Sequence, residues 1–481
     1  MNFSRDVVDA APAGARALVE LTSEGGRREW SFGEVADRSA RLAGTLKARG
    51  VGRGDVVMTL IGNRPDWVLT MVACFRLGAV ALPGSEQLRA KDLRIRIAAA
   101  EPMLIVADER NASELSAAAP TGEVVLVPDE RLYDGEPAPP VELEPTDPCL
   151  ITFTSGTTGE AKGVVHGQRY LPGQRLQASH WLGAGSGDLV WCTAASGWSK
   201  SARNVFIAPW LQGAAALLHD ARFDPFQRLE ILAAERVNLL CMAPTEYRVI
   251  AKRAQLSRLA DLRGLVAAGE ALNPEVLRAF QEGTGLPIRD GYGQTETGQL
   301  TGMPAGGEVR PGSMGQALPG IALDISDDEL VLSAPSSDPT FFVGYLAGEP
   351  APEHEPWRTG DRVRRDDDGY LFFEGRIDDV IISAGYRIGP FEVESALVSH
   401  PAVAEAAVVA APDEERGAVV RAVIVLRDGF SPGSGLATEL QDHVKRETAP
   451  YKYPRVVEFA AELPKTASGK VQRAVLRGSG S

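Results

Sequence analysis

Short apolar runs alternate with amphipathic segments along most of the chain. Residues 56–61 form a β-rich apolar run, Pro65 is suited to the first turn of a helix, and residues 79–82 are apolar again. Comparable units recur near residues 100–128, 188–220 and 237–290. Strands that alternate with helices in this way favour largely parallel sheets, so the pattern predicts an α/β body.

The pattern changes twice in the last third of the chain. From residue 310 onward it consists of short β runs separated by Gly, Pro and Asp, which indicates a small barrel or meander. After the sequence GRIDD, a helix opened by Pro390, two strands and a further helix near residues 435–447 form a compact α+β pattern. A segment of about a hundred residues is long enough to form a domain of its own.

These patterns predict two domains joined by a short hinge. We expect an α/β fold whose large N-terminal domain, residues 1–375, consists of stacked, mostly parallel sheets with helices plus a small β-barrel. Residues 376–379 are the predicted hinge. Residues 380–481 are the predicted C-terminal domain, a small and mobile α+β unit.

Composition narrows the classes of function. The 481 residues are 44% hydrophobic and 24% charged, which is typical of a folded globular protein. The formal net charge of −14 argues against a general nucleic-acid or anionic-membrane surface, because binding a polyanion requires clustered Lys and Arg. We therefore expect no nucleic-acid and no membrane partner, and a bound anion must meet a local positive site.

The cysteines and the absence of long apolar runs indicate the compartment. Four cysteines lie far apart without a C-x-x-C pair, which favours reduced thiols over zinc ligands. The first residues lack the apolar segment of a signal peptide, and no apolar run reaches the roughly 18 residues of a membrane span. We expect a cytoplasmic protein.

The stretch ITFTSGTTGEAKGVVHG, residues 151–167, has the composition of a phosphate-binding loop. An apolar run leads into glycines, hydroxyl side chains and one lysine, and glycine lets backbone N–H groups approach an anion. A P-loop fits poorly, because Lys162 stands between Ala161 and Gly163 rather than after Gly and before Ser or Thr. An ordinary Ser/Thr/Gly turn is the other alternative. The density of donors favours a phosphate loop of another kind, made of Thr154, Ser155, Gly156, Thr157, Thr158, Gly159 and Lys162.

Four more motifs combine charged residues with glycine. DGYGQTETG contains Glu296, EPWRTGD ends in Asp361, GRIDDVIISAGYRIG carries Arg376 and Arg387, and LPKTASGK ends in Lys470. Taken singly, each has an ordinary explanation: a turn, a helix-capping aspartate, surface salt bridges, or a solvated lysine near a chain end. Their joint occurrence in this order is not explained by four separate coincidences.

The order TSGTTGEAKG, GYGQTE, RTGD, GRIDDVIISAGYRI, PKTASGK is similar to that of the adenylate-forming superfamily of acyl-CoA synthetases, nonribosomal-peptide adenylation domains and luciferases. The resemblance spans about residues 30–473. Two segments, GWSKSARNVFIAPWLQGA and APYKYPRVVEF, look most like medium-chain acyl-CoA synthetases. The resemblance implies an ATP-dependent, AMP-forming carboxylate–CoA ligase that uses Mg²⁺. A small carboxylic acid would react with ATP to acyl-AMP and pyrophosphate, and the acyl group would then pass to coenzyme A. An enzyme that loads an acyl or peptidyl carrier protein is the alternative.

The resemblance also assigns roles to residues. The first step brings two anions together, so positive groups at the developing charge lower its barrier. Lys470 is the implied catalytic donor, Thr295 contacts the α-phosphate, Glu296 is the magnesium ligand, and Asp378 is the hinge position. The remaining implied nucleotide contacts are Gly269, Glu270, Ala271, Asp290, Gly291, Tyr292, Gly293, Gln294, Asp361 (ribose hydroxyls), Arg376 and Arg387. The implied coenzyme A contacts are Ala384, Gly385, Tyr386, Tyr453, Pro454 and Arg455, with Arg421 and Lys445 as further phosphate contacts.

The prediction of an acid-binding pocket rests on Gly293 and on the segment that contains Trp198, Val205 and Phe206. Acetyl-CoA synthetases carry tryptophan immediately before the glutamine of the Q-T-E motif, where this chain has Gly293. An open pocket lined by Gly293, Trp198, Val205 and Phe206 would suit a medium-chain fatty acid or an aryl acid. The alternative is that Gly293 only permits a tight backbone turn. A homodimer is left open.

Overall fold

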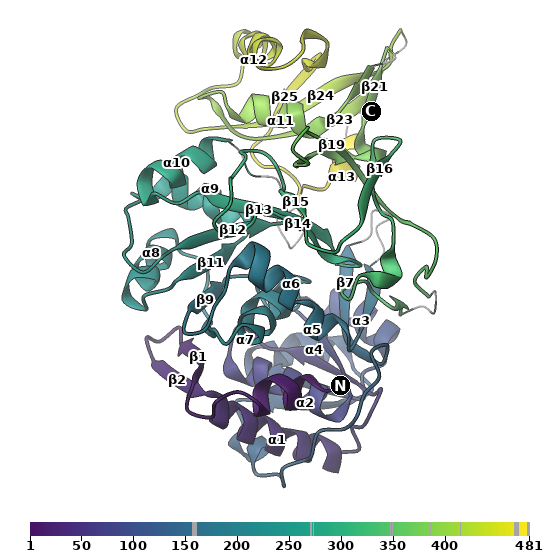
Figure 1. Ribbon diagram of the computed structural model, residues 1–481. Helices are drawn as coiled ribbons and strands as arrows, with labels where there is room; N and C mark the ends of the chain where they lie inside the picture. The colour runs from purple at the N-terminus through teal and green to yellow at the C-terminus, as the bar shows by residue number, and fades with distance from the viewer. Residues whose placement is uncertain are drawn as a thin grey trace.

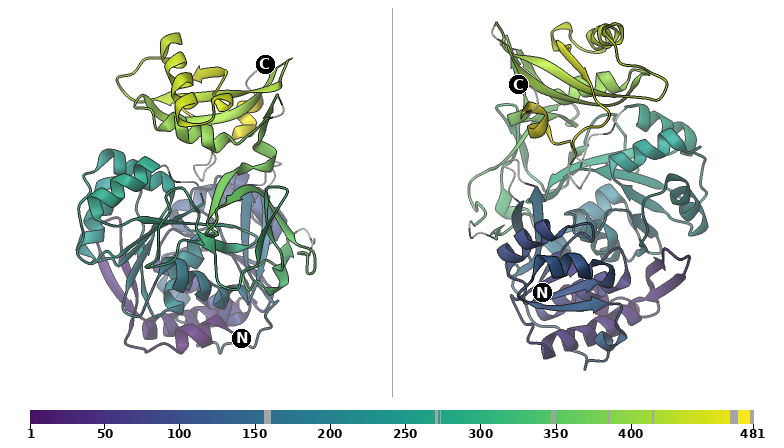
Figure 2. Two further views of the ribbon diagram at one scale, coloured as in Figure 1. Left: turned by 45° about the horizontal axis from the view of Figure 1, so that its top comes forward. Right: turned by 180° about the vertical axis from the view of Figure 1, so that it is seen from behind.

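The computed structural model describes residues 1–155, 161–269, 272, 274–346, 348, 350–384, 386–413, 415–465 and 471–478; the side chains at positions 155, 161 and 387 are also outside the description. Most of the chain forms one large body, and a smaller C-terminal unit lies above it (Figures 1 and 2).

The larger of two main sheets contains nine strands, and its central six are parallel. In spatial order these strands are β15 (Gln316–Ala317), β14 (Gly298–Gly302), β13 (Ile288–Gln294), β12 (Gly264–Ala268), β11 (Leu239–Met242), β9 (Leu189–Cys192), β10 (Ala215–His219), β1 (Arg16–Leu21) and β2 (Arg27–Ser31). Helices α8 (Pro225–Ala234), α9 (Pro244–Arg253) and α10 (Pro274–Thr284) pack on its outer face.

The second main sheet contains seven strands and is parallel except at one edge. In order these are β18 (Gly344–Tyr345), β8 (Ala161–Gly167), β7 (Pro148–Ser155), β4 (Val80–Pro83), β3 (Val56–Leu60), β5 (Leu104–Asp108) and β6 (Glu123–Val127). Helices α3 (Ala90–Ala100) and α4 (Ala112–Ala118) cover its outer face. The predicted 56–82 strand–helix–strand unit is confirmed, but the return strand β8 after the glycine-rich segment was not predicted.

Helices and the largest hydrophobic cluster fill the space between the two main sheets. They include α1 (Phe32–Ala48), α2 (Pro65–Leu77), α5 (Tyr170–Gly173), α6 (Arg175–Gln177) and α7 (Ala208–Leu211). Helix α1 begins with a capping box between Ser31 and Glu34. Helix α2 begins at a proline and ends at Gly78 with φ = 70°, and nearly all its side chains are buried because sheets lie on both sides of it.

The segment beyond residue 310 forms an open antiparallel meander: β16 (Leu323–Ser326), β17 (Glu329–Leu332), β19 (Trp357–Arg365) and β20 (Leu371–Arg376). Of the two predicted alternatives, barrel and meander, the described strands form the meander, since β16 and β20 stand at opposite edges. Strand β20 then leads into the helical turn Ile377–Asp379 and the C-terminal unit.

The C-terminal unit has its own hydrophobic core. It contains the hairpin β21 (Ile381–Ser383) and β22 (Tyr386–Ile388), helices α11 (Pro390–Val398), α12 (Ser434–Glu447) and α13 (Arg473–Gly478), and the sheet β23 (Val403–Asp413), β24 (Gly417–Leu426) and β25 (Val456–Phe459). The predicted helix starting at Pro390 is confirmed. Within the described part of the chain, no helix is long and apolar enough to cross a membrane.

Candidate active site

The glycine-rich segment lies in a β7–β8 hairpin that places Thr154 directly opposite Lys162. Gly156, Thr157, Thr158 and Gly159, together with the side chain of Ser155, lie outside the described residues. The described flanks therefore place one hydroxyl and one ammonium group at the base of the predicted phosphate loop.

Lys162 and Glu296 belong to the same site. The Lys162 Nζ lies 5.4 Å from the centre of the Tyr345 ring, and the Tyr345 hydroxyl donates to Glu296 Oε1 at 3.1 Å. Burial lowers the pKa of the nearby His166 of β8 to about 3, so its imidazole is neutral. The hairpin and the Q-T-E segment, which are over a hundred residues apart in sequence, are thus joined by side-chain contacts.

The predicted magnesium ligand can be tested against its surroundings. Within the described residues, no group of three His, Cys, Asp or Glu side chains is arranged to hold a metal ion. Mg²⁺ in nucleotide sites needs only one or two carboxylates, because substrate phosphates and water supply the other ligands. Glu296, near Lys162 at the base of the loop, fits that kind of site.

Asp361 is the centre of a second group of polar side chains. It is almost fully buried, and it accepts hydrogen bonds at Oδ2 from the Tyr292 hydroxyl and from Gln294 Nε2, the latter at 2.9 Å. Arg376 Nη1 donates to Oδ1 at 3.2 Å and to the Thr359 carbonyl at 3.0 Å. The structure therefore brings together residues from the GYGQTE, RTGD and GRIDD motifs.

The electrostatics and backbone of this group are consistent with a bound polar ligand. Burial raises the pKa of the Asp361 carboxyl, while Arg376 and the donors from Tyr292 and Gln294 act in the opposite direction. Gly360 has φ = 70°, and a Cβ there would lie 2.8 Å from the Arg376 guanidinium. The glycine of RTGD thus allows the arginine to approach the aspartate.

A third group lies at the carboxyl ends of β12 and β13. Lys200 Nζ donates to the Ala268 carbonyl at 2.8 Å, and a Cβ at Gly269, where φ is 100°, would lie 3.3 Å from that nitrogen. Burial raises the pKa of Asp290 to about 8, opposed by the Gly291 N–H and by Lys200. Glu270 and Ala271, predicted for the same segment, lie outside the described residues.

Lys200 was not among the predicted site residues. A single lysine in a loop gives no periodic signal, and its place beside Ala268 depends on the pairing of strands far apart in sequence. The only indication available from the sequence was its position inside the GWSKSARNVF segment.

The geometry at Gly293 favours the alternative interpretation, a tight backbone turn, over an open acid pocket. A Cβ at Gly293 would lie 1.8 Å from the Gly298 carbonyl oxygen and 2.9 Å from the Gln299 Cα, so a side chain would run into the backbone of β14. The alternative interpretation, that glycine is needed for a tight hairpin, agrees with this geometry and with the register shift between Tyr292 and Gly293.

The other predicted pocket residues occupy two environments. Trp198 is partly exposed in the loop before Lys200. Val205 and Phe206 are fully buried in the helical turn Arg203–Ile207. The Phe206 ring packs edge-on against Trp67 at 5.7 Å and lies 5.0 Å from Trp210, so Phe206 belongs to the core between the main sheets. A pocket lined by Phe206 is therefore not what the described packing shows.

The predicted hinge residue Asp378 lies just before the C-terminal unit, and the predicted coenzyme A contacts lie on that unit. Asp378 stands in the turn after β20, where its Oδ1 accepts from Arg376 Nε at 3.3 Å. Ala384 has φ = 48°, and the Tyr386 ring stacks on Tyr451 at 4.4 Å. Gly385, the side chain of Arg387, and Lys470 lie outside the described residues.

Arg421 is not placed to contact coenzyme A phosphates. It is buried on β24, forms two hydrogen bonds of 2.7 Å with the Glu458 carboxylate, and donates to the Leu476 carbonyl at 2.8 Å. The Arg421 guanidinium is therefore already paired inside the C-terminal unit, and the prediction that it contacts coenzyme A phosphates is corrected. The matching acid stands on a separate strand, β25, and no local pattern in the sequence predicted this pairing.

The remaining acceptor residues form a cluster on the edge of the same unit. Arg455 Nη1 donates to the Tyr453 hydroxyl at 2.8 Å, and Lys445 Nζ lies 4.4 Å from the Tyr453 ring and 2.9 Å from Asp442. The Pro454 carbonyl accepts from a glutamine of α12. The predicted residues therefore do come together, with Tyr453 at their centre.

Two protein-family models match most of the chain. The AMP-binding enzyme family matches residues 5–337, and the AMP-binding enzyme C-terminal domain matches residues 392–470. The chain is 41% identical to acyl-coenzyme A synthetase ACSM4, mitochondrial, from Rattus norvegicus, over 99% of this chain and 90% of the relative. It is 37% identical to the uncharacterized acyl-CoA ligase YtcI of Bacillus subtilis, over 99% of this chain and 95% of that one.

Solved structures agree with the fold. The anthranilate CoA ligase AuaEII in complex with anthranoyl-AMP superposes with a TM-score of 0.89 at 27% identity, covering 100% of this chain and 97% of that chain. A benzoate CoA ligase from Burkholderia xenovorans LB400 superposes with a TM-score of 0.87 at 27% identity, covering 99% of this chain and 100% of that chain. A Brucella canis acyl-CoA synthetase superposes with a TM-score of 0.77 at 34% identity, covering 100% of this chain and 94% of that chain. The chain belongs to the AMP-binding enzyme family, as an ATP-dependent acyl-CoA synthetase with a large N-terminal domain and a smaller C-terminal one.

Proposed function

We propose that the enzyme activates a medium-chain fatty or aryl carboxylic acid with Mg²⁺ and ATP and then transfers the acyl group to coenzyme A. The observation that carries the proposal is that the segment 292–296 contributes to two groups of polar side chains: Lys162 with Glu296, and Asp361 with Tyr292 and Arg376. The first group suits phosphates and a cation, and the second suits a ribose.

Asp361 would hold the ribose through its remaining acceptor capacity. A carboxylate has about four acceptor positions. Tyr292 and Gln294 occupy two on Oδ2, and Arg376 occupies one on Oδ1, so the outer side of Oδ1 remains for a hydroxyl. A second ribose hydroxyl would have to replace one of the present donors.

The phosphates would lie over the β7–β8 hairpin. Lys162 would neutralise part of their charge, and Glu296 would hold Mg²⁺, which spreads the charge that develops when pyrophosphate leaves. Lys470 would approach the substrate carboxylate and α-phosphate from the C-terminal unit. We propose that this unit, residues 380–481, turns about residues 376–379 between the two half-reactions.

Tyr386 and Tyr453 are the proposed anchors for coenzyme A on the C-terminal unit. Tyr386 is 53% exposed and already stacked on Tyr451, so an adenine or pantetheine segment can lie against an ordered aromatic surface. Lys445 and Arg455, beside Tyr453, supply positive charge for phosphates. Cytoplasmic location and homodimer formation stay predictions.

The proposal is tested by measuring AMP release from ATP with a panel of acids: acetate, hexanoate, octanoate, benzoate and anthranilate. The expected result is coenzyme-A-dependent release with hexanoate, octanoate or benzoate well above acetate. Higher identity to the medium-chain relatives than to the aryl ligases favours the fatty acids within the panel. AMP release that depends on a purified carrier protein and not on coenzyme A would support a carrier protein as the acyl acceptor. A preference for acetate over the other acids would contradict a medium-chain or aryl substrate.

A further inference from the structure

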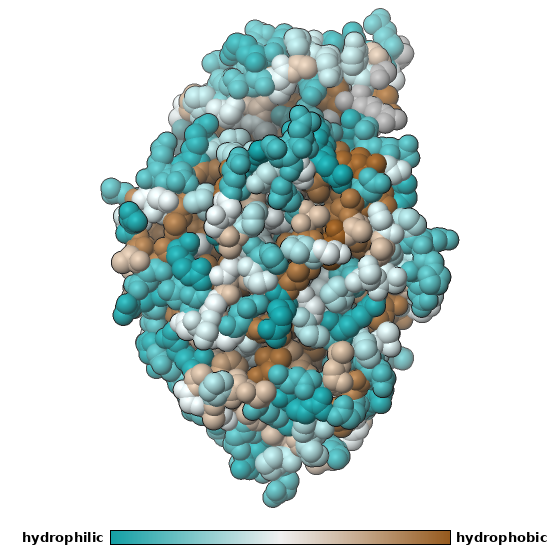
Figure 3. Space-filling model, in the orientation of Figure 1, coloured by the Kyte–Doolittle hydropathy of each residue, from teal (hydrophilic) through white to brown (hydrophobic). Residues whose placement is uncertain are grey.

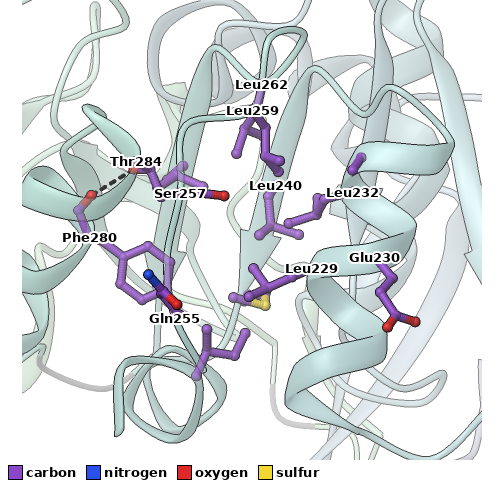
Figure 4. A pocket seen from close by; sticks show the side chains of 14 residues that line it. Leu229, Glu230, Leu232, Leu240, Gln255, Ser257, Leu259, Leu262, Phe280 and Thr284 are labelled. Carbon is purple, nitrogen blue, oxygen red and sulfur yellow. Dashed lines mark hydrogen bonds between the residues drawn. The ribbon is translucent and has the colours of Figure 1, made fainter. Parts of the chain in front are cut away.

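An apolar cavity lies on the outer face of the nine-stranded sheet, away from the groups described above (Figure 4). Its volume is about 240 Å³. Helices α8, α9 and α10, strands β11 and β12, and the segment of residues 255–262 contribute its lining. All the lining residues lie in the described part of the chain.

Ten of the fourteen lining residues are apolar, and six of these are leucine. Leu240 and Leu265 project from the sheet, Leu229 and Leu232 come from α8, and Phe280 comes from α10. Figure 4 shows Leu229, Leu232, Leu240 and Phe280 around a common space, with Leu259 and Leu262 above them. An unfilled apolar cavity destabilises a protein in proportion to its volume, and a cavity of about 150 Å³ already accepts a benzene molecule. A larger leucine-lined cavity is therefore suited to a hydrocarbon ligand.

The cavity is separated from the nucleotide site by the sheet itself. On β11, Leu240 and Met242 line the cavity, whereas Cys241 belongs to the cluster between the two main sheets. Lys200 and Asp361, which mark the nucleotide side, contribute nothing to the lining. A ligand here would not compete with ATP for space.

The mouth of the cavity carries polar and positive groups. Gln255 and Ser257 line it and are exposed to solvent, and the Ser257 hydroxyl points into the space in Figure 4. The same surface segment carries the exposed cations Lys252, Arg253 and Arg258. Glu230 is the acidic lining residue, and its carboxylate points away from the cavity in Figure 4. Figure 3 shows apolar surface on the same side of the molecule, over α8 and α9.

From these features we infer a second ligand site that binds a short amphiphilic anion, an unbranched hydrocarbon tail with a terminal carboxylate or similar group. The tail enters between Leu229, Leu240 and Phe280, and the anionic head stays at the mouth near Ser257 and Arg258. The apolar lining selects the tail by burial, and the cations select the charge of the head. This site is additional to the catalytic one and does not depend on which acid the enzyme activates.

The test uses 1-octanesulfonate, an amphiphilic anion that cannot become an acyl-CoA, in calorimetric titrations of the full-length protein. Ser257→Trp places an indole in the cavity, and Ala260→Trp adds the same bulk to the same segment at an exposed position outside the lining. The expected result is that Ser257→Trp loses one equivalent of binding while Ala260→Trp keeps it. Both variants are expected to keep acyl-CoA synthesis within about twofold of the unsubstituted enzyme, which also reports that they are folded.

A charge reversal tests the head group without adding bulk. Arg258→Glu is expected to weaken octanesulfonate binding at this site by about fivefold or more and to leave the binding of neutral 1-octanol unchanged. If the unsubstituted protein and Ser257→Trp bind the same number of octanesulfonate molecules, the proposed second site is contradicted. Octanol that binds as tightly as octanesulfonate, with no effect of Arg258→Glu, would overturn the assignment of an anionic ligand.

Discussion

The large body and the C-terminal unit hold their site residues differently. In the body, Asp361 is buried and receives hydrogen bonds from Tyr292, Gln294 and Arg376. On the C-terminal unit, Tyr386 stacks on a neighbouring tyrosine while about half of its surface remains exposed. The proposed nucleotide site is therefore already ordered around Asp361, whereas the proposed acceptor surface around Tyr386 remains open to a ligand or to another part of the protein.

In the described part of the chain, the contacts between the two regions include an exposed ion pair and an aromatic pair. Arg427, after β24, lies 3.4 Å from Glu275 in the first turn of α10, and both side chains are partly exposed. Phe373 of β20 meets Phe391 of α11 with ring centres 6.2 Å apart. Contacts of this kind can be broken and remade at low cost, as the proposed rotation of the C-terminal unit would require.

The largest expected effect comes from removing the proposed catalytic cation. Lys470→Ala should lower adenylate formation from acid and ATP by at least about a hundredfold, because a positive charge is lost where negative charge develops. Thioester formation from supplied acyl-AMP and coenzyme A should stay near the original rate. Measuring the two half-reactions separately checks this, with Lys465→Ala as the matched control; equal loss of both would contradict the division of roles.

A smaller effect is expected from neutralising Asp361, the proposed ribose-binding carboxylate in the body. Asp361→Asn keeps the shape but loses the charge that Arg376 and Tyr292 meet, and a hydrogen bond to a charged group contributes about 1.5–3 kcal/mol. The kcat/KM for ATP should fall roughly ten- to hundredfold, since each 1.4 kcal/mol is a factor of about ten. The KM for coenzyme A should change little. The exposed aspartate at position 367 supplies a control, Asp367→Asn. An unchanged kcat/KM for ATP would remove Asp361 from the nucleotide site.

Gly293→Ala tests the interpretation of Gly293 as a turn residue. The new Cβ would meet the β14 backbone, and such overpacking typically costs about 1–3 kcal/mol. Chemical denaturation should show that loss of stability, whereas Gly14→Ala, where the added Cβ meets open space, should show almost none. The ratio of hexanoate to acetate activity should stay nearly constant. A large shift of that ratio toward acetate without loss of stability would restore the open-pocket interpretation.

The smallest effect concerns the contact between the regions. Arg427→Ala removes an exposed ion pair, whose contribution is about 0.2–1 kcal/mol. The ratio of the two half-reaction rates should change by less than about fivefold, and the change should disappear at high salt because ions screen the pair. Arg446→Ala, on the same unit, is the control. A change of a hundredfold would mean that this contact is a major determinant of the domain arrangement.

The sequence predicted the elements that depend on local patterns. The 56–82 unit, the helix at Pro390 and the meander follow from periodicity and from residues that start or end helices. It also predicted that separate motifs would meet, because their order resembles that of a known superfamily. The contacts that it missed are long-range ones. Three such contacts depend on strand pairing between distant segments. They are the close approach of the β14 backbone to Gly293, the partner of Arg421 on β25, and the position of Lys200 beside Ala268.

The most direct test of the two-region account is Asp378→Pro, which fixes φ near −65° at the proposed hinge. Asp378→Ala is the control, since it removes the carboxylate that Arg376 contacts and leaves the backbone free to turn. The account predicts that Asp378→Pro forms acyl-AMP at nearly the original rate but transfers the acyl group to coenzyme A at least about tenfold more slowly, while Asp378→Ala performs both steps. Full turnover by Asp378→Pro at the unsubstituted rate would contradict rotation about residues 376–379.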